Sequence, residues 1–393
     1  MITDTEEHIT PSKIIDVTSC DIKFYKTIDE VSSVWDIGGG DCTFMSSAFY
    51  KALESSPPSG TSYRYGIIYA NNKPVGWLYY QLKKIELDKS LSIEGSSVYA
   101  KLKRLLARRV RYYTLVAGNM TLTGTYGFKF GNVSTEQQWK LKLRGAEELV
   151  AELKSEGIKV RGVLLKDYCE HLETSKGLEG YTEFSVQPNM LMNIPKEWSS
   201  FDDYLAAMKS KYRVRVRRAR KKADALTKRV LTTAEIKENS SKIISLYQNV
   251  ANGAGFNLFI LPELYFYHLQ HFLDDKMTLT AYYEGAEMVG FYTSIKNHND
   301  LDAHFLGYSP QHNKSCQLYL NMLYDLVEDA ITMKVDMLIM SRTAMEIKSS
   351  VGAEAKPMFL YMKLTQPFLN KYLPKALAYF VPETTWKARS PFK

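Results

Sequence analysis

The chain has 393 residues, of which 45% are hydrophobic and 24% charged, and its formal net charge is +8. This length favours two domains of roughly 150–200 residues each, and the apolar content excludes an extended disordered protein. No apolar run reaches the roughly 20 residues of a membrane span, the N-terminus lacks signal-peptide character, and the four cysteines and seven histidines show no metal-binding spacing. We therefore expect a cytoplasmic protein without a metal site.

A pattern in the first half of the chain recurs in the second half. Residues 64–80 and residues 277–293 both consist of a Tyr-rich strand, a short polar turn and a second strand that opens with Val-Gly-aromatic. Asn71-Asn72 and Gly285-Ala286 provide plausible hairpin turns. The two copies are too far apart for a solenoid repeat, so they predict a duplicated domain.

The elements that follow each hairpin also correspond. In the first half, a strand over 112–124 precedes a helix that starts near Ser134 and stops at Gly157. In the second half, a strand over 301–309 precedes a helix over 315–333 and a buried strand over 335–340. This order predicts a mixed α/β fold with largely antiparallel sheets in two tandem domains, 1–195 and 196–393.

The second domain is expected to open with one long basic helix over 200–228. Apolar residues lie three or four apart along it, and its other face is dominated by Arg and Lys. A face of like charges attracts cofactor phosphates, nucleic acid or anionic lipid headgroups, although it can also be a merely solvated surface. The arginines expected to bind a polyanion are Arg213, Arg215, Arg217, Arg218 and Arg220.

Several stretches carry a family resemblance: 44–56, 118–128, 164–168, 188–222, 307–331 and 341–357. With them the chain resembles the bacterial FemAB-like N-acyltransferases, which have two domains of the acetyltransferase (GNAT) type. The resemblance implies two tandem GNAT-like domains and acyl transfer to an amine. Within this group, some enzymes acylate peptidoglycan precursors from aminoacyl-tRNA, and others acylate long-chain amines, as the bacterial ceramide synthases do.

The loops before the two central helices bear on the acyl donor. Neither FKFGNVSTEQ nor YSPQHNKSCQ matches the glycine-rich loop that holds the pyrophosphate of acetyl-CoA in GNAT enzymes. We therefore expect no tightly bound cofactor, with acyl-CoA or acyl-ACP as a co-substrate. The residues expected to bind the carrier are Asn313, Lys314, Arg342 and Lys348, although capping explains Asn313 and a surface helix explains 342–348 almost as well.

The strand over 301–309 holds the best catalytic candidates. Period-two alternation puts Asp302, His304 and Tyr308 on one face. Asp302 would orient His304 or raise its pKa, His304 would act as the base, and Tyr308 would protonate the leaving group. Glu346 is a second candidate base. The alternative is a half-buried strand whose polar side chains are hydrogen-bonded core residues.

These features favour an N-acyltransferase that moves an acyl group from a thioester carrier to a primary amine in bacterial lipid or envelope biosynthesis. One alternative is an aminoacyl-tRNA-dependent transferase acting on a peptidoglycan precursor, with tRNA on the basic helix. Another is a nonenzymatic polyanion-binding protein on the same scaffold. The basic helix and the aromatic segment 368–381 are also compatible with peripheral contact at the anionic inner membrane face.

Overall fold

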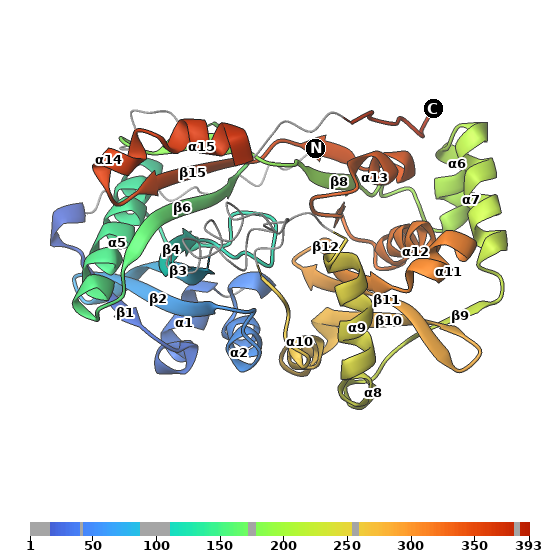
Figure 1. Ribbon diagram of the computed structural model, residues 1–393, viewed down its shortest axis with the longest axis horizontal. Helices are drawn as coiled ribbons and strands as arrows, with labels where there is room; N and C mark the ends of the chain where they lie inside the picture. The colour runs from blue at the N-terminus through green and yellow to red at the C-terminus, as the bar shows by residue number, and fades with distance from the viewer. Residues whose placement is uncertain (1–15, 40–41, 87–110, 172–177, 254–258, 381–385) are drawn as a thin grey trace, which may run out of the picture.

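The computed structural model describes residues 16–39, 42–86, 111–171, 178–253, 259–380 and 386–393. Two β-sheets lie side by side, with helices packed around both of them (Figure 1). Helices long and apolar enough to cross a membrane are not found within these ranges. The expected mixed α/β fold with largely antiparallel sheets is confirmed.

The first sheet contains residues from both ends of the chain. Its strands follow the spatial order β1 (Asp21–Tyr25), β2 (Thr61–Ala70), β3 (Lys73–Glu86), β4 (Arg111–Ala117), β6 (Val160–Tyr168), β15 (Phe359–Leu364) and β7 (Thr182–Ser185), and β5 (Phe128–Phe130) pairs with β3.

The second sheet repeats this arrangement. Its strands follow the order β9 (Leu226–Val230), β10 (Met277–Glu284), β11 (Glu287–Asn297), β12 (Asp300–Tyr308), β13 (Met337–Ile339), β8 (Asn189–Asn193) and β14 (Glu354–Lys356). Each sheet has one parallel pair among its described strands, β4 with β6 and β12 with β13.

The two sheets exchange one strand each. The late strand β15 lies between β6 and β7 in the first sheet, while the early strand β8 lies between β13 and β14 in the second (Figure 1). Both occupy the same place in their sheets, next to the downstream strand of the parallel pair. A division at residue 195 would therefore leave each sheet with one strand from the other side of the boundary. The domain boundary itself stays a prediction.

Three apolar cores hold the helices to the sheets. The helices of the first half are η1 (Val17–Ser19), η2 (Ile28–Glu30), α1 (Ser32–Gly39), η3 (Thr43–Met45), α2 (Ser47–Ser55) and α5 (Thr135–Ser155). Those of the second half are α6 (Phe201–Ala207), α7 (Ser210–Lys222), α8 (Thr233–Glu238), α9 (Ser240–Ala251), α10 (Tyr265–Leu273), η5 (Asp274–Lys276), α11 (Pro310–Cys316), α12 (Leu318–Thr332), α13 (Met345–Val351), α14 (Pro367–Asn370) and α15 (Leu373–Phe380). α5 covers the outer face of the first sheet and α12 that of the second.

The third core joins the two halves. Phe49 and Tyr79 from the first half belong to the same buried cluster as Tyr265 and Phe291 from the second. Polar contacts cross there as well, since the amide of Thr43 donates to Asn297 Oδ1 over 2.9 Å. Because apolar side chains from both halves fill this interface, the halves form a continuous structure.

Local sequence signals explain several elements. Asn71 and Asn72 both have positive φ (50° and 60°), as the tight β2–β3 turn requires. Gly285 has a φ of 60° in the corresponding β10–β11 turn. The Ser134 side chain caps α5 by accepting from the amide of Gln137, and Gly157 follows its end with a φ of 78°. These predictions are confirmed.

The long basic helix over 200–228 was a wrong prediction, because the structure has two helices there. Ser200 caps α6 as expected, but Met208 is extended and its backbone bridges to Phe392 near the C-terminus. α7 starts at Ser210, and Leu226 already belongs to β9. The apolar spacing runs through all three segments, so only the tertiary contacts reveal the breaks.

Asp325 on α12 ties α7 and β9 to the second core. It is 1% exposed and accepts from Arg220 Nη1 and Lys228 Nζ over 2.7 Å each, and from the hydroxyl of Tyr282. We expect Asp325→Asn to lower the free energy of unfolding by about 2–4 kcal/mol, because two cations lose their anionic counter-charge and one acceptor oxygen is replaced by a donor group. Urea unfolding measures the change. The neighbouring half-exposed Glu328 is the control, and equal losses for Glu328→Gln would contradict this role.

Candidate active site between the two halves

The carboxyl ends of the two parallel strand pairs turn toward the interface. β12 pairs with β13 as far as Asp302 and Ile339, and β4 pairs with β6 as far as Ala117 and Leu165. The strands separate beyond these points. In α/β sheets, ligands contact the chain at the carboxyl ends of parallel strands. Segments 118–124, 166–167 and 340–344 therefore define the candidate site.

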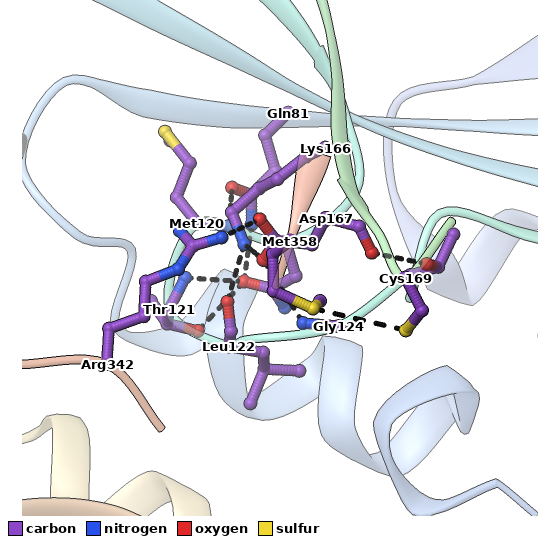
Figure 2. A network of polar contacts seen from close by, with 12 residues as sticks. Gln81, Met120, Thr121, Leu122, Gly124, Lys166, Asp167, Cys169, Arg342 and Met358 are labelled. Carbon is purple, nitrogen blue, oxygen red and sulfur yellow. Dashed lines mark hydrogen bonds and ion pairs between the residues drawn. The ribbon is translucent and has the colours of Figure 1, made fainter. Parts of the chain in front are cut away.

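Asp167 is the centre of a buried ionic cluster in this site. Its carboxylate binds Lys166 and, from the other half of the chain, Arg342 (Figure 2). The amide of Gly124 also donates to it over 3.1 Å. Asp167 is fully buried and has a φ of 64°, a left-handed conformation that Asp tolerates. Burial lowers the pKa of Lys166, and the nearby Asp167 carboxylate opposes that shift.

A second polar chain crosses from the first half to His304. Asn119 Oδ1 accepts from Gln81 Nε2 over 3.0 Å and from Thr121 Oγ1 over 2.8 Å (Figure 2 shows Gln81 and Thr121). The Thr121 hydroxyl also interacts with Tyr265, whose own hydroxyl lies 2.9 Å from His304 Nε2. The position of the His304 ring thus depends on a loop of the first half.

Asp302 has the most unusual environment of the expected residues. It is 1% exposed, and its Oδ2 atom has no hydrogen-bond partner among the described residues. Burial raises the pKa of this carboxyl from 3.8 to about 7, with a smaller contribution from Asp300 and an opposing one from Lys348. A carboxyl group with a pKa near neutrality is suited to take up and release a proton at pH 7.

Lys348 is fixed by a strained loop next to Asp302. Its Nζ donates to the carbonyls of Met340 over 2.5 Å and Arg342 over 2.6 Å. Burial lowers the pKa of Lys348 to about 7, while Asp302 raises it. In the same loop Thr343 has a φ of 69°, which is rare for a β-branched residue. Such strain clusters at functional sites, where surrounding contacts enforce it.

His304 is a poor base in this environment. Burial lowers its pKa to about 3, so the ring is neutral at pH 7. Asp302 was expected to orient His304 or to raise its pKa. The pKa is lowered instead, because the buried ring lies between aromatic side chains. His304 is better placed to orient Tyr265 than to accept a proton.

The lowered pKa of His304 predicts a pH-dependent stability. As pH falls below 6.5, His304 takes up a proton in the unfolded chain, whereas in the folded protein it stays neutral down to about pH 3. The free energy of unfolding therefore falls between pH 6.5 and about pH 3. Between pH 7.5 and pH 5, the free energy of unfolding of the wild type should fall by about 2 kcal/mol more than that of His304→Gln. Urea unfolding at both values measures the difference. Parallel pH dependences of the two proteins would contradict it.

Tyr308 lies apart from Asp302 and His304. A β-bulge opposite Thr293 interrupts the alternation between β11 and β12, and the Thr293 hydroxyl bonds to both the amide and the carbonyl of Phe305. Tyr308 therefore packs beside Tyr319 in the second core, with ring centroids 6.0 Å apart. The expected common face of the three residues is wrong, because the bulge shifts the side-chain period by one.

The four residues expected to bind the carrier do not come together. Arg342 is paired with Asp167, and Lys348 is enclosed by carbonyls. Asn313 accepts from the amide of Tyr319 over 2.9 Å and so caps α12, while Lys314 is exposed on α11.

The expected polyanion-binding arginines divide into two sets. Arg215, Arg217 and Arg218 are exposed on α7. Arg213 donates to the carbonyl of Met208 over 2.5 Å, and Arg220 binds Asp325. Only the first set forms an open basic surface. Glu346 lies nearby, where it pairs with Arg389 on the outer side of α13, away from Asp302.

A model of the FemAB-like family, described as peptidoglycan biosynthesis/recognition, matches residues 96–341, well over half of the chain. The chain belongs to the FemAB-like family. No curated protein matches it in sequence.

Several solved structures are similar to this FemAB-like protein. The crystal structure of FemX matches with a TM-score of 0.53 and 10% identity, over 91% of this chain and 99% of that chain. A tandem GNAT protein from the clavulanic acid biosynthesis pathway matches with a TM-score of 0.49 and 10% identity, over 88% of this chain and 99% of that chain. L-PGS from Bacillus licheniformis matches with a TM-score of 0.46 and 10% identity, over 84% of this chain and 96% of that chain. At 10% identity the likeness to FemX concerns the fold alone, and it shows that the chain shares the fold of FemX over most of its length.

Membership of this family supports a transferase of cell-envelope biosynthesis. Several residues of the candidate site of this FemAB-like protein were not predicted from the sequence: Lys166, Asp167, Asn119 and Tyr265. For Asp167 a signal existed, because a Lys-Asp pair directly ends an expected strand. For Tyr265 there was none, since one Tyr in an apolar helix is usually a core residue.

Proposed function

We propose that this protein is an N-acyltransferase that moves an acyl group from a thioester carrier, acyl-CoA or acyl-ACP, to a primary amine. The observation that carries the proposal is the buried Asp302 carboxyl at the junction of the two halves, with one oxygen unpartnered and a pKa near 7. An amine is an ammonium ion at neutral pH, so transfer requires a base at the site.

In the proposed reaction the ammonium gives one proton to Asp302 and becomes the nucleophile. The nitrogen attacks the thioester carbonyl, and the C–S bond breaks as the new C–N bond is completed. The second proton of the nitrogen passes to the departing sulfur, and Asp302 later releases its proton to solvent. No covalent enzyme intermediate is needed when donor and acceptor are held together.

A second candidate is transfer from aminoacyl-tRNA to a peptidoglycan precursor. The family description and the exposed arginines of α7 favour it, because a row of arginines suits a nucleic-acid backbone.

Peripheral membrane contact also stays a proposal, supported by the exposed side chains of Phe368, Leu369 and Tyr372.

A donor panel separates the candidates. The purified chain is incubated with acyl-CoA, acyl-ACP or aminoacyl-tRNA, together with a long-chain amine or an amino-bearing muropeptide, and products are measured by mass spectrometry. We expect an amide product from a thioester donor. Product from aminoacyl-tRNA alone would establish the second candidate instead, and tRNA binding without any product would point to a nonenzymatic protein.

A further inference from the structure

A cavity of about 630 Å³ is lined by residues of α7, of α13 and of the C-terminal segment. Four charged side chains line it: Lys211, Arg215, Glu346 and Arg389. Tyr212 and Ile347 add an apolar wall. Its volume is within the range of small-molecule sites, about 300–1,000 Å³.

The C-terminal segment fixes one wall of this cavity. The amide of Lys209 donates to the carbonyl of Pro391 over 2.8 Å, and the amide of Arg389 donates to Ser349 Oγ over 3.0 Å. Arg389 is thereby anchored to α13, opposite the basic side chains of α7. The cavity is formed by three segments far apart in the sequence, which is why no linear motif reveals it.

The charges in the cavity are unbalanced. Glu346 pairs with Arg389, whereas neither Lys211 nor Arg215 makes an ion pair with any described residue. Both are exposed at the cavity rim. Cations held close together without counter-charges attract a multivalent anion, and a guanidinium group matches the geometry of a phosphate.

The cavity also touches the loop that holds Lys348. Ala344 lines it, with a φ of 47°. Two residues earlier, the Arg342 carbonyl accepts from Lys348 and the Arg342 side chain binds Asp167. A ligand in the cavity would therefore lie against the outer side of the loop whose inner side faces the candidate active site.

We propose that this cavity binds a phosphate ester of nucleotide size through Lys211, Arg215 and Arg389. If the proposed function holds, this ligand is the carrier end of the acyl donor. The binding of a phosphate ester in the cavity does not depend on the proposed function. This assignment moves carrier recognition from Asn313, Lys314, Arg342 and Lys348 to a different set of cations. The apolar wall accommodates the organic part of the ester.

Calorimetric titration of the full chain with adenosine 3′,5′-bisphosphate, and separately with inorganic diphosphate, tests the cavity. We expect R215A/R389A to weaken bisphosphate binding by at least about tenfold, since two charge-assisted contacts are lost. Lys211→Ala provides a single exposed change, should the double variant fail to fold. Glu346→Gln should tighten binding severalfold, because it removes the one carboxylate in the cavity.

The control is K196A/K276A, which removes the same number of charges from exposed positions outside the cavity. Equal weakening in this control, or no bisphosphate binding by the wild type, would overturn the proposal. Bisphosphate binding without acyl transfer from any thioester would leave the cavity assignment in place and contradict the proposed function alone.

Discussion

Replacing Asp302 by asparagine should lower kcat/KM for acyl transfer by about 10²–10⁴-fold, the usual contribution of a positioned general base. Asparagine has the same shape, but its amide cannot accept the proton of the ammonium ion. Asp302 is 1% exposed, and its pKa of about 7 lets it exchange that proton near neutral pH. Steady-state kinetics of both proteins with the preferred donor measures the effect.

The pH dependence gives the same experiment a second readout. The wild-type rate should rise with pH through about 7 as Asp302 ionises, and this rise should be absent in Asp302→Asn. The exposed Asp336, just before β13, is the matched control, and Asp336→Asn should retain both rate and pH profile. An Asp302→Asn protein with the wild-type rate would remove Asp302 from the chemistry.

Folding of the Asp302 variant can be checked independently. Because burial raises the pKa of Asp302 from 3.8 to about 7, the folded protein holds a proton that the unfolded chain releases in this range. The contribution of Asp302 to stability therefore falls as pH rises from about 4 to about 7. The stability of Asp302→Asn should not show this pH dependence, and the variant should be no less stable than the wild type at pH 7.

Replacing Asp167 by asparagine should lower the free energy of unfolding by about 3–5 kcal/mol, because it leaves buried positive charge without its counter-ion. Lys166 is 6% exposed, and the side chain of Arg342 is 19% exposed. Asparagine tolerates the positive φ of this position, so the change isolates the charge. Chemical denaturation measures the loss.

Two comparisons make this prediction specific. Asp29 forms an exposed ion pair with Lys51 over 2.9 Å, and Asp29→Asn should cost less than about 1 kcal/mol. The double variant D167N/K166M should recover part of the loss, since it removes one stranded charge as well. Equal costs at Asp167 and Asp29 would show that the cluster does not stabilise the interface.

The hairpins and the first central helix could be predicted because their determinants are local. A two-residue turn needs residues that adopt positive φ, which Asn71 and Asn72 supply. A helix start needs a capping side chain, which Ser134 supplies. The second hairpin follows the same rule at Gly285.

The arrangement of the candidate site could be predicted only in part. Asp302 and His304 could be selected as candidates because strand alternation and residue chemistry are visible in the sequence. Their relation to Tyr308 was not, because a bulge opposite Thr293 shifts the period by one. The direction of the pKa shift at His304 depends on burial, which the strand pattern leaves open.

The sequence by itself determined the duplicated α/β pattern, the family resemblance and the basic character of residues 209–222, since these depend on composition and short-range spacing. Only the tertiary structure decided which sheet β8 and β15 join, because an isolated strand pairs with whichever edge its neighbours leave open. It also decided the break at Met208, where Phe392 competes for the backbone. Finally, it paired Asp167 with Arg342 across 175 positions, since a buried charge takes its partner by proximity in space.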